Sequence, residues 1–255
     1  MEASGQLAVL AHLALAAATA AVYAVVRPPR PARLAGYGGF IGMLGAWALW
    51  ATSPMLRVAR ALRLTPTALT SIGLLLNVAA GVLAAVGAFG WAWVALLWGS
   101  AADMLDGELA RSTGTSSRAG AFLDSSLDRV SEIALLAGLG YLLHPERAGV
   151  VCAVAALAAS FMVSYARARG EGLGVSCPTF GLERPHRMVV FIFSMLTAAF
   201  LSPHAAAVLL TYTCGLIALG AGLTALGRMF IIHQLLRREG EPSRDWHGTP
   251  PGTTP

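Results

Sequence analysis

The stretch ADMLDGELARSTGTSSRAGAFLDSSLDRV, residues 102–130, places acidic side chains in two apolar segments and indicates how these segments pack. It holds four of the five aspartates in the chain, which are Asp103, Asp106, Asp124 and Asp128. The first two are three positions apart and the last two are four apart, so each pair projects from one face of a helix. The polar connection at 112–119 predicts a turn that packs the two helices antiparallel with their acidic faces opposed.

The composition identifies a lipid bilayer as the solvent of this chain. Of its 255 residues, 56% are hydrophobic and only 12% are charged, with a mean hydropathy of +0.65. Soluble domains carry about twice that charged fraction. Because lipid cannot satisfy open backbone polar groups, each apolar window long enough to cross must be a helix. We therefore expect an all-α, polytopic membrane protein.

The net charge of +5 does not indicate a nucleic-acid-binding protein, because the arginines occur in short clusters between apolar segments. Loop charge on the cytoplasmic side explains this distribution. The first apolar stretch, 7–26, has the alternative of a signal peptide. However, the preceding MEASGQ lacks a basic residue and the stretch is long for such a signal, so we expect a retained span.

Four regions are expected along the chain. An extra N-terminal transmembrane helix and basic linker occupy 1–35, and an interfacial helix, bent or broken within 38–64, occupies 36–66. A six-helix catalytic core occupies 67–234, and a disordered cytoplasmic tail occupies 235–255. The apolar part at 36–53 has the alternative of an eighth crossing. The expected core spans are 68–87, 91–111, 119–143, 148–168, 187–202 and 205–232.

Four carboxylates in so small a volume require neutralisation. Two unit charges 4 Å apart repel by about 4 kcal/mol at an effective dielectric near 20. Arg111 and Arg118 supply too little positive charge to balance the set. Divalent metal resolves the conflict, and hard oxygen ligands favour Mg²⁺, Mn²⁺ or Ca²⁺. A two-metal site suits phosphoryl chemistry, so the predicted substrate is a phosphate ester or anhydride.

The acidic cluster has two other interpretations. The aspartates could serve only to tie helices together by ion pairs with nearby arginines, although one or two acids would suffice for that purpose. Alternatively, the cluster could line the path of a divalent-cation transporter. Transport predicts polar residues that continue across the bilayer, whereas polarity here is concentrated at one end of the helices.

The spacing of the acidic window resembles the complete signature of the CDP-alcohol phosphatidyltransferase family. Its eight fixed residues are Asp103, Asp106, Gly107, Ala110, Arg111, Gly120, Asp124 and Asp128. The resemblance implies a six-helix core after an interfacial helix, a homodimer, and an active site open to the cytoplasm. It also implies transfer from a CDP-alcohol with release of CMP.

The same resemblance implies roles for individual residues. Metal is expected at Asp103, Asp106, Asp124 and Asp128, and Asp128 is also the expected catalytic base. The CDP moiety is expected to contact Asp103, Gly107, Ala110, Arg111 and Gly120, together with Pro66 and Thr70 at the start of the first core span. Thr67 stands where many members have Asn, which departs from the pattern.

Two further stretches bear on the acceptor. SYARAR at 164–169 and ERPHR at 183–187 resemble stretches of bacterial phosphatidylinositol phosphate synthases and their archaeal ether-lipid relatives. The expected acceptor-binding residues are Ser164, Arg167, Arg169, Arg184 and Arg187. Converging arginines suit an acceptor that is itself phosphorylated. The alternative is ordinary cytoplasmic loop charge.

These observations predict metal-dependent transfer of a phosphatidyl group from CDP-diacylglycerol to a polyol or polyol-phosphate hydroxyl. Inositol phosphate is the preferred acceptor, and glycerol 3-phosphate or another alcohol is the alternative. The expected cofactor is Mg²⁺ or Mn²⁺, as two ions, and the expected partners are membrane lipids and a second copy of the chain. The expected location is the cell membrane.

Overall fold

The computed structural model describes residues 2–29, 39–144, 146–176 and 179–238, and within these ranges it contains helices and no strands. The bounds are α1 (Glu2–Val26), α2 (Gly39–Ala61), α3 (Pro66–Ala85), α4 (Phe89–Thr113), α5 (Arg118–Leu142), α6 (Arg147–Gly172), α7 (Arg184–Ala198) and α8 (Pro203–Arg238). The all-α prediction is confirmed. Residues 30–38 of the linker region and the tail from residue 239 lie outside the described residues.

Local sequence signals explain where the helices around the acidic window begin and end. The Thr65 hydroxyl accepts a hydrogen bond from the amide of Ala68, and Pro66 occupies the first position of α3. Gly114 ends α4 with a φ of 67°, a conformation that glycine adopts without strain. Ser117 then caps α5 by accepting from the amide of Gly120 at 3.0 Å. The predicted turn between the acidic pairs is therefore present.

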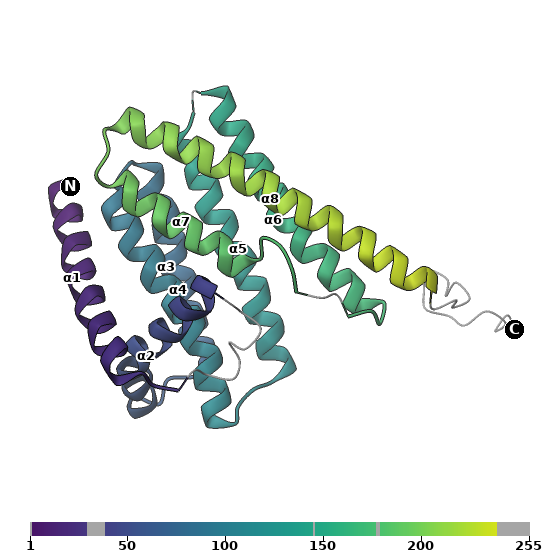
Figure 1. The fold of residues 1–255 in the computed structure, drawn as a ribbon, viewed down its shortest axis with the longest axis horizontal. Helices are drawn as coiled ribbons and strands as arrows, with labels where there is room; N and C mark the ends of the chain where they lie inside the picture. The colour runs from purple at the N-terminus through teal and green to yellow at the C-terminus, as the bar shows by residue number, and fades with distance from the viewer. Residues whose placement is uncertain (1, 30–38, 145, 177–178, 239–255) are drawn as a thin grey trace, which may run out of the picture.

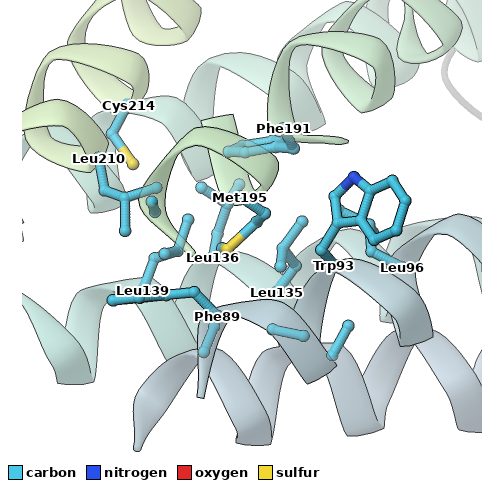
Figure 2. Packing of buried hydrophobic residues seen from close by; sticks show 14 of the residues in the cluster. Phe89, Trp93, Leu96, Leu135, Leu136, Leu139, Phe191, Met195, Leu210 and Cys214 are labelled. Atoms are coloured by element: carbon cyan, nitrogen blue, oxygen red, sulfur yellow. The ribbon is translucent and has the colours of Figure 1, made fainter. Parts of the chain in front are cut away.

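The apolar core lies toward the end of the bundle opposite the acidic window. It combines Phe89, Trp93 and Leu96 of α4 with Leu135, Leu136 and Leu139 of α5, Phe191 and Met195 of α7, and Leu210 and Cys214 of α8 (Figure 2). All ten are buried. This packing holds four helices together and fixes the relative positions of their polar ends.

Glycine permits close contacts between α3 and its two neighbouring helices. A Cβ added to Gly81 of α3 would strike the backbone carbonyl of Ala134 in α5, and one added to Gly138 would strike the backbone of Gly81. On the other side of α3, a Cβ at Gly99 of α4 would overlap the side chain of Asn77. Helix α3 is thus in close contact with both acidic helices, α4 and α5.

Among the described helices, four are long and apolar enough to cross a membrane, namely α1, α3, α6 and α8. The chain is an integral membrane protein. Helix α7 has only 15 residues, and α4 and α5 carry the charged residues of the acidic window. These features explain why hydropathy singles out fewer helices than the seven crossings that we predicted.

Helix α1 stands at one side of the bundle and packs mainly against α4 (Figure 1). The indole N–H of Trp98 donates to Nε2 of His12 at 2.9 Å. At the other end of α1, the rings of Tyr23 and Trp50 meet edge to face, which joins α1 to α2. The predicted extra N-terminal helix is therefore attached to the core by specific polar and aromatic contacts.

Some predicted boundaries are displaced. Helix α8 continues to Arg238, past the predicted end of the core at residue 234. Helix α7 begins at Arg184, three residues earlier than predicted, because the proline at position 185 suits a first helical turn. Helix α2 is a single helix with Pro54 inside it.

Candidate active site

The acidic window folds as predicted, with the polar ends of α4 and α5 side by side beside the start of α3. Asp106 is 4% exposed, and its Oδ2 accepts a hydrogen bond of 2.6 Å from the hydroxyl of Thr70. That hydroxyl also bonds the carbonyl of Pro66 one turn earlier. Thr70 thus holds an expected metal ligand in place, and Pro66 contacts Thr70.

Asp103 lies between helices from three parts of the chain. Its Oδ2 accepts from the amide of Asn77 on α3 at 3.4 Å and from the guanidinium of Arg184 on α7 at 2.9 Å. A Cβ at Gly73 would collide with the Asp103 carboxylate. Glycine at that position leaves the space that the carboxylate fills.

The second acidic pair faces the first across the helix interface. Oδ1 of Asp128 pairs with Nη1 of Arg184 at 2.7 Å. Asp124, one turn earlier on α5, lies near enough to interact electrostatically with Asp103 and Arg184. All four signature aspartates therefore belong to one cluster, to which α7 contributes the neighbouring cation.

Two buried ion pairs lie beneath this cluster. Arg187 is fully buried, and its guanidinium donates to both carboxylate oxygens of Glu132 at 2.7 and 2.9 Å and to the carbonyl of Leu182. Glu183 pairs with Arg228 of α8 in an equally buried contact. We expected Arg187 to bind the acceptor, but in this arrangement its guanidinium is committed to α5.

The expected nucleotide-binding residues line the outer part of the same helix ends. Gly107 lies under the Arg111 guanidinium, whose Nη1 would be 3.3 Å from an added Cβ. Arg111 is half exposed and pairs with Glu108 at 3.2 Å. The carbonyl of Ala110 accepts a hydrogen bond from the amide of Thr115 at the end of α4. The amide of Gly120 donates to the hydroxyl of Ser117, which caps α5.

The remaining acceptor candidates, Ser164, Arg167 and Arg169, lie on the last turns of α6. The Ser164 hydroxyl bonds the carbonyl of Ser160 in its own helix. Arg167 is about half exposed and pairs with Glu171 at 2.8 Å. Arg169 lines a cavity of about 200 Å³ between α6 and α8. Of the five candidates, Arg184 contacts the acidic cluster, through Asp103 and Asp128.

The donor set fits a hard divalent cation, because carboxylate oxygens from two facing helices are the ligands that Mg²⁺ and Mn²⁺ prefer. In addition, the side-chain oxygen of Asn77 is buried beside Asp103 without a hydrogen-bond partner. Across the described ranges, no three acidic, histidine or cysteine side chains are close enough to hold one ion. The Arg184 guanidinium lies between the carboxylates of Asp103 and Asp128.

Several residues of the site were not singled out from the sequence. Asn77 and Gly73 carry no distinctive signal in an apolar helix. Glu132, by contrast, is an acidic residue one turn beyond Asp128 in a membrane helix, and such residues are functional by default. Arg228 gives the same signal in α8. Both were identifiable, although their partners were not.

The chain belongs to the CDP-alcohol phosphatidyltransferase family, whose model matches residues 63–226. The match spans α3 to α7 and most of α8, and it includes the whole acidic cluster. Helices α1 and α2 fall outside the matched residues.

Among similar proteins, the phosphatidylinositol phosphate synthase of Streptomyces avermitilis is 35% identical over 158 residues, which are 58% of this chain and 63% of that enzyme. The archaetidylinositol phosphate synthase of Pyrococcus horikoshii is 34% identical over 175 residues, which are 61% of this chain and 84% of that enzyme. The chain therefore aligns with less than two thirds of the Streptomyces enzyme and with most of the Pyrococcus enzyme.

Two crystal structures of the Mycobacterium tuberculosis phosphatidylinositol phosphate synthase are similar in fold, each 27% identical and covering 71% of this chain. The complex with manganese and citrate superposes with a TM-score of 0.65, and the match covers 88% of that chain. The structure with CDP-diacylglycerol bound superposes with a TM-score of 0.64, and the match covers 92% of that chain.

Proposed function

We propose that this protein transfers a phosphatidyl group from CDP-diacylglycerol to a hydroxyl of a phosphorylated polyol, with inositol phosphate as the acceptor, and releases CMP. The observation that carries the proposal is the cluster of four signature aspartates, with Thr70, Asn77 and Arg184 around it. The relatives named above, whose products are inositol phosphate lipids, support the choice of acceptor.

In this proposal Asp103, Asp106, Asp124 and Asp128 hold Mg²⁺ or Mn²⁺, as two ions. When bound, the metal neutralises charge that develops on the phosphoryl oxygens and on the leaving CMP. The manganese complex of the mycobacterial relative supports this assignment. Thr70 keeps Asp106 oriented through its 2.6 Å hydrogen bond. The CDP moiety lies against Pro66, Gly107, Ala110, Arg111 and Gly120.

Asp128 takes the proton of the acceptor hydroxyl as the hydroxyl oxygen attacks the β-phosphorus of CDP-diacylglycerol. The bond between that phosphorus and the bridging oxygen breaks, and CMP leaves with the electron pair. Such a single displacement needs positioning and charge neutralisation more than a covalent intermediate. Ser164, Arg167, Arg169 and Arg184 are the proposed contacts for the phosphorylated acceptor, and Arg187 instead supports α7 through Glu132.

The test is CMP release by the purified full-length protein. CMP should form only when CDP-diacylglycerol, Mg²⁺ or Mn²⁺ and an acceptor are all present, and EDTA should abolish it. The acceptors to compare are inositol phosphate, glycerol 3-phosphate, serine and inositol. Preference for glycerol 3-phosphate would replace the proposed acceptor, and no CMP with any acceptor would overturn the reaction.

We also propose that the polar ends of α4 and α5 face the cytoplasm. The exposed Arg118 at the start of α5 provides a probe position, as Arg118→Cys. An impermeant maleimide should label this cysteine in inverted vesicles and not in intact cells. The proposed homodimer is tested separately, by light scattering on the purified protein in detergent. Labelling in intact cells would reverse the orientation.

A further inference from the structure

One guanidinium joins the two acidic helices. Arg184 donates from Nη2 to Oδ2 of Asp103 on α4 at 2.9 Å and pairs through Nη1 with Oδ1 of Asp128 on α5 at 2.7 Å. Its side chain is 18% exposed, and those of the two acids are 11% and 17% exposed. The contact is thus largely shielded from water, and charge interactions are stronger in such a place than in water.

The backbone that carries Arg184 is fastened from two directions. Just before it, Glu183 pairs with Arg228 of α8, and the amide of Leu182 donates to the hydroxyl of Thr224 at 2.9 Å. One turn after it, Arg187 is bound to Glu132 of α5. These contacts fix the first turn of α7, so the Arg184 side chain starts from a set position beside the aspartates.

The planar fork of a guanidinium can span two carboxylates, and its charge persists at any physiological pH. Asp103 and Asp128 are also two of the proposed metal ligands. A divalent cation at those oxygens would repel a guanidinium bound to the same oxygens. Arg184 and the metal are therefore alternative counter-charges for the same pair of acids.

We propose that Arg184 is a tethered counter-cation that the divalent metal displaces from Asp103 and Asp128, and that the displaced guanidinium then binds a phosphate group of a substrate. This inference rests on the proposed function for the metal and the substrate class. Guanidinium groups pair with phosphate oxygens through two parallel hydrogen bonds, so the released side chain has a ready partner within its reach. Arg184 would act in binding and positioning, with no part in proton transfer.

The first test is a Mn²⁺ titration of purified full-length protein without nucleotide, with free Mn²⁺ followed by electron paramagnetic resonance. Arg184→Gln removes the competitor and should bind Mn²⁺ about tenfold more tightly than wild type, within the usual range of coupling between sites. Arg184→Lys keeps the charge but cannot bridge both acids. Its Mn²⁺ affinity should therefore lie between those of wild type and Arg184→Gln.

The matched control is Arg118→Gln, which removes an equal charge from an exposed residue at the same end of α5. Its Mn²⁺ affinity should stay within about twofold of wild type, because Arg118 is exposed and water and salt screen exposed charges. Equal or weaker Mn²⁺ binding by Arg184→Gln, or an equal gain in Arg118→Gln, would overturn the displacement.

The second test concerns the released guanidinium. At saturating Mn²⁺, Arg184→Gln should raise the KM for CDP-diacylglycerol or for inositol phosphate at least about tenfold, despite its tighter metal binding. Unchanged KM values for both substrates would overturn the phosphate-binding half. If wild type releases no CMP, the proposed function fails, whereas the Mn²⁺ titration still decides whether Arg184 competes with metal.

Discussion

At the scale of single residues, Asp128 combines a position at the acidic cluster with contact to Arg184. If it removes the acceptor proton, Asp128→Asn should lower kcat for CMP formation by about 10²–10⁴-fold, the usual contribution of a general base. Steady-state CMP release at saturating Mn²⁺ measures this. Glu146→Gln, an exposed acid in the connection to α6, is the control. Undiminished kcat in Asp128→Asn would remove the residue from that role.

The buried pair of Glu132 and Arg187 gives a prediction about stability. Glu132→Leu alone leaves the guanidinium buried and unpaired, which typically costs about 3–5 kcal/mol. The double variant Glu132→Leu, Arg187→Met removes both charges and should recover most of that loss. Thermal unfolding in detergent compares the three proteins. A double variant as unstable as Glu132→Leu alone would contradict the pairing.

Residue by residue, the sequence predicts the acids of the site better than their partners. The four aspartates follow from helical spacing, because residues three or four apart share a face whatever the tertiary fold. The residue that each arginine pairs with depends on which helix lies opposite. Spacing within one helix does not contain that information. Arg187 was therefore predicted to contact the acceptor, while its actual partner, Glu132, lies 55 positions away.

At the scale of helices, the backbone contact between α3 and α5 fixes how closely these two helices approach each other. Gly81→Ala would place a methyl group against the carbonyl of Ala134. Because both partners are helix backbone, the helices must separate, at a cost of about 1–3 kcal/mol. We expect a lower melting temperature in detergent together with reduced CMP release.

Gly222→Ala in α8 is the matched control for that substitution, since nothing lies within 4 Å of its added Cβ. Alanine there should leave CMP release unchanged and raise stability by up to about 1 kcal/mol, because glycine is a poor residue for a helix interior. Equal behaviour of the two variants would show that the contact between α3 and α5 does not constrain the site.

Helix positions were largely predictable, because apolar windows and capping residues are local. Thr65, Gly114 and Ser117 end or begin helices within two residues of the predicted limits of their spans. The length of α8 was not predictable in this way. Its last turns are polar, and packing against α6 continues the helix where hydropathy alone would end it.

At the scale of the whole molecule, α1 is an addition to the family core. The hydrogen bond from Trp98 to His12 joins the two, and its loss typically costs about 1 kcal/mol. His12→Ala should therefore lower the melting temperature by a few degrees and leave kcat within about twofold of wild type. A large loss of CMP release at a temperature where the variant is folded would give α1 a part in the reaction.

The charge pairs between α5, α7 and α8 bear on how the chain enters the membrane during synthesis. Helix α7 spans about 22 Å, less than the hydrocarbon thickness of about 30 Å, and carries two arginines in its first turns. Alone it is a poor substrate for insertion. Glu132 is already in place when α7 emerges, and Arg228 arrives afterwards with α8. We therefore expect the hairpin of α7 and α8 to enter the membrane as a unit, with its arginines paired to Glu132 and Glu183 once it is there.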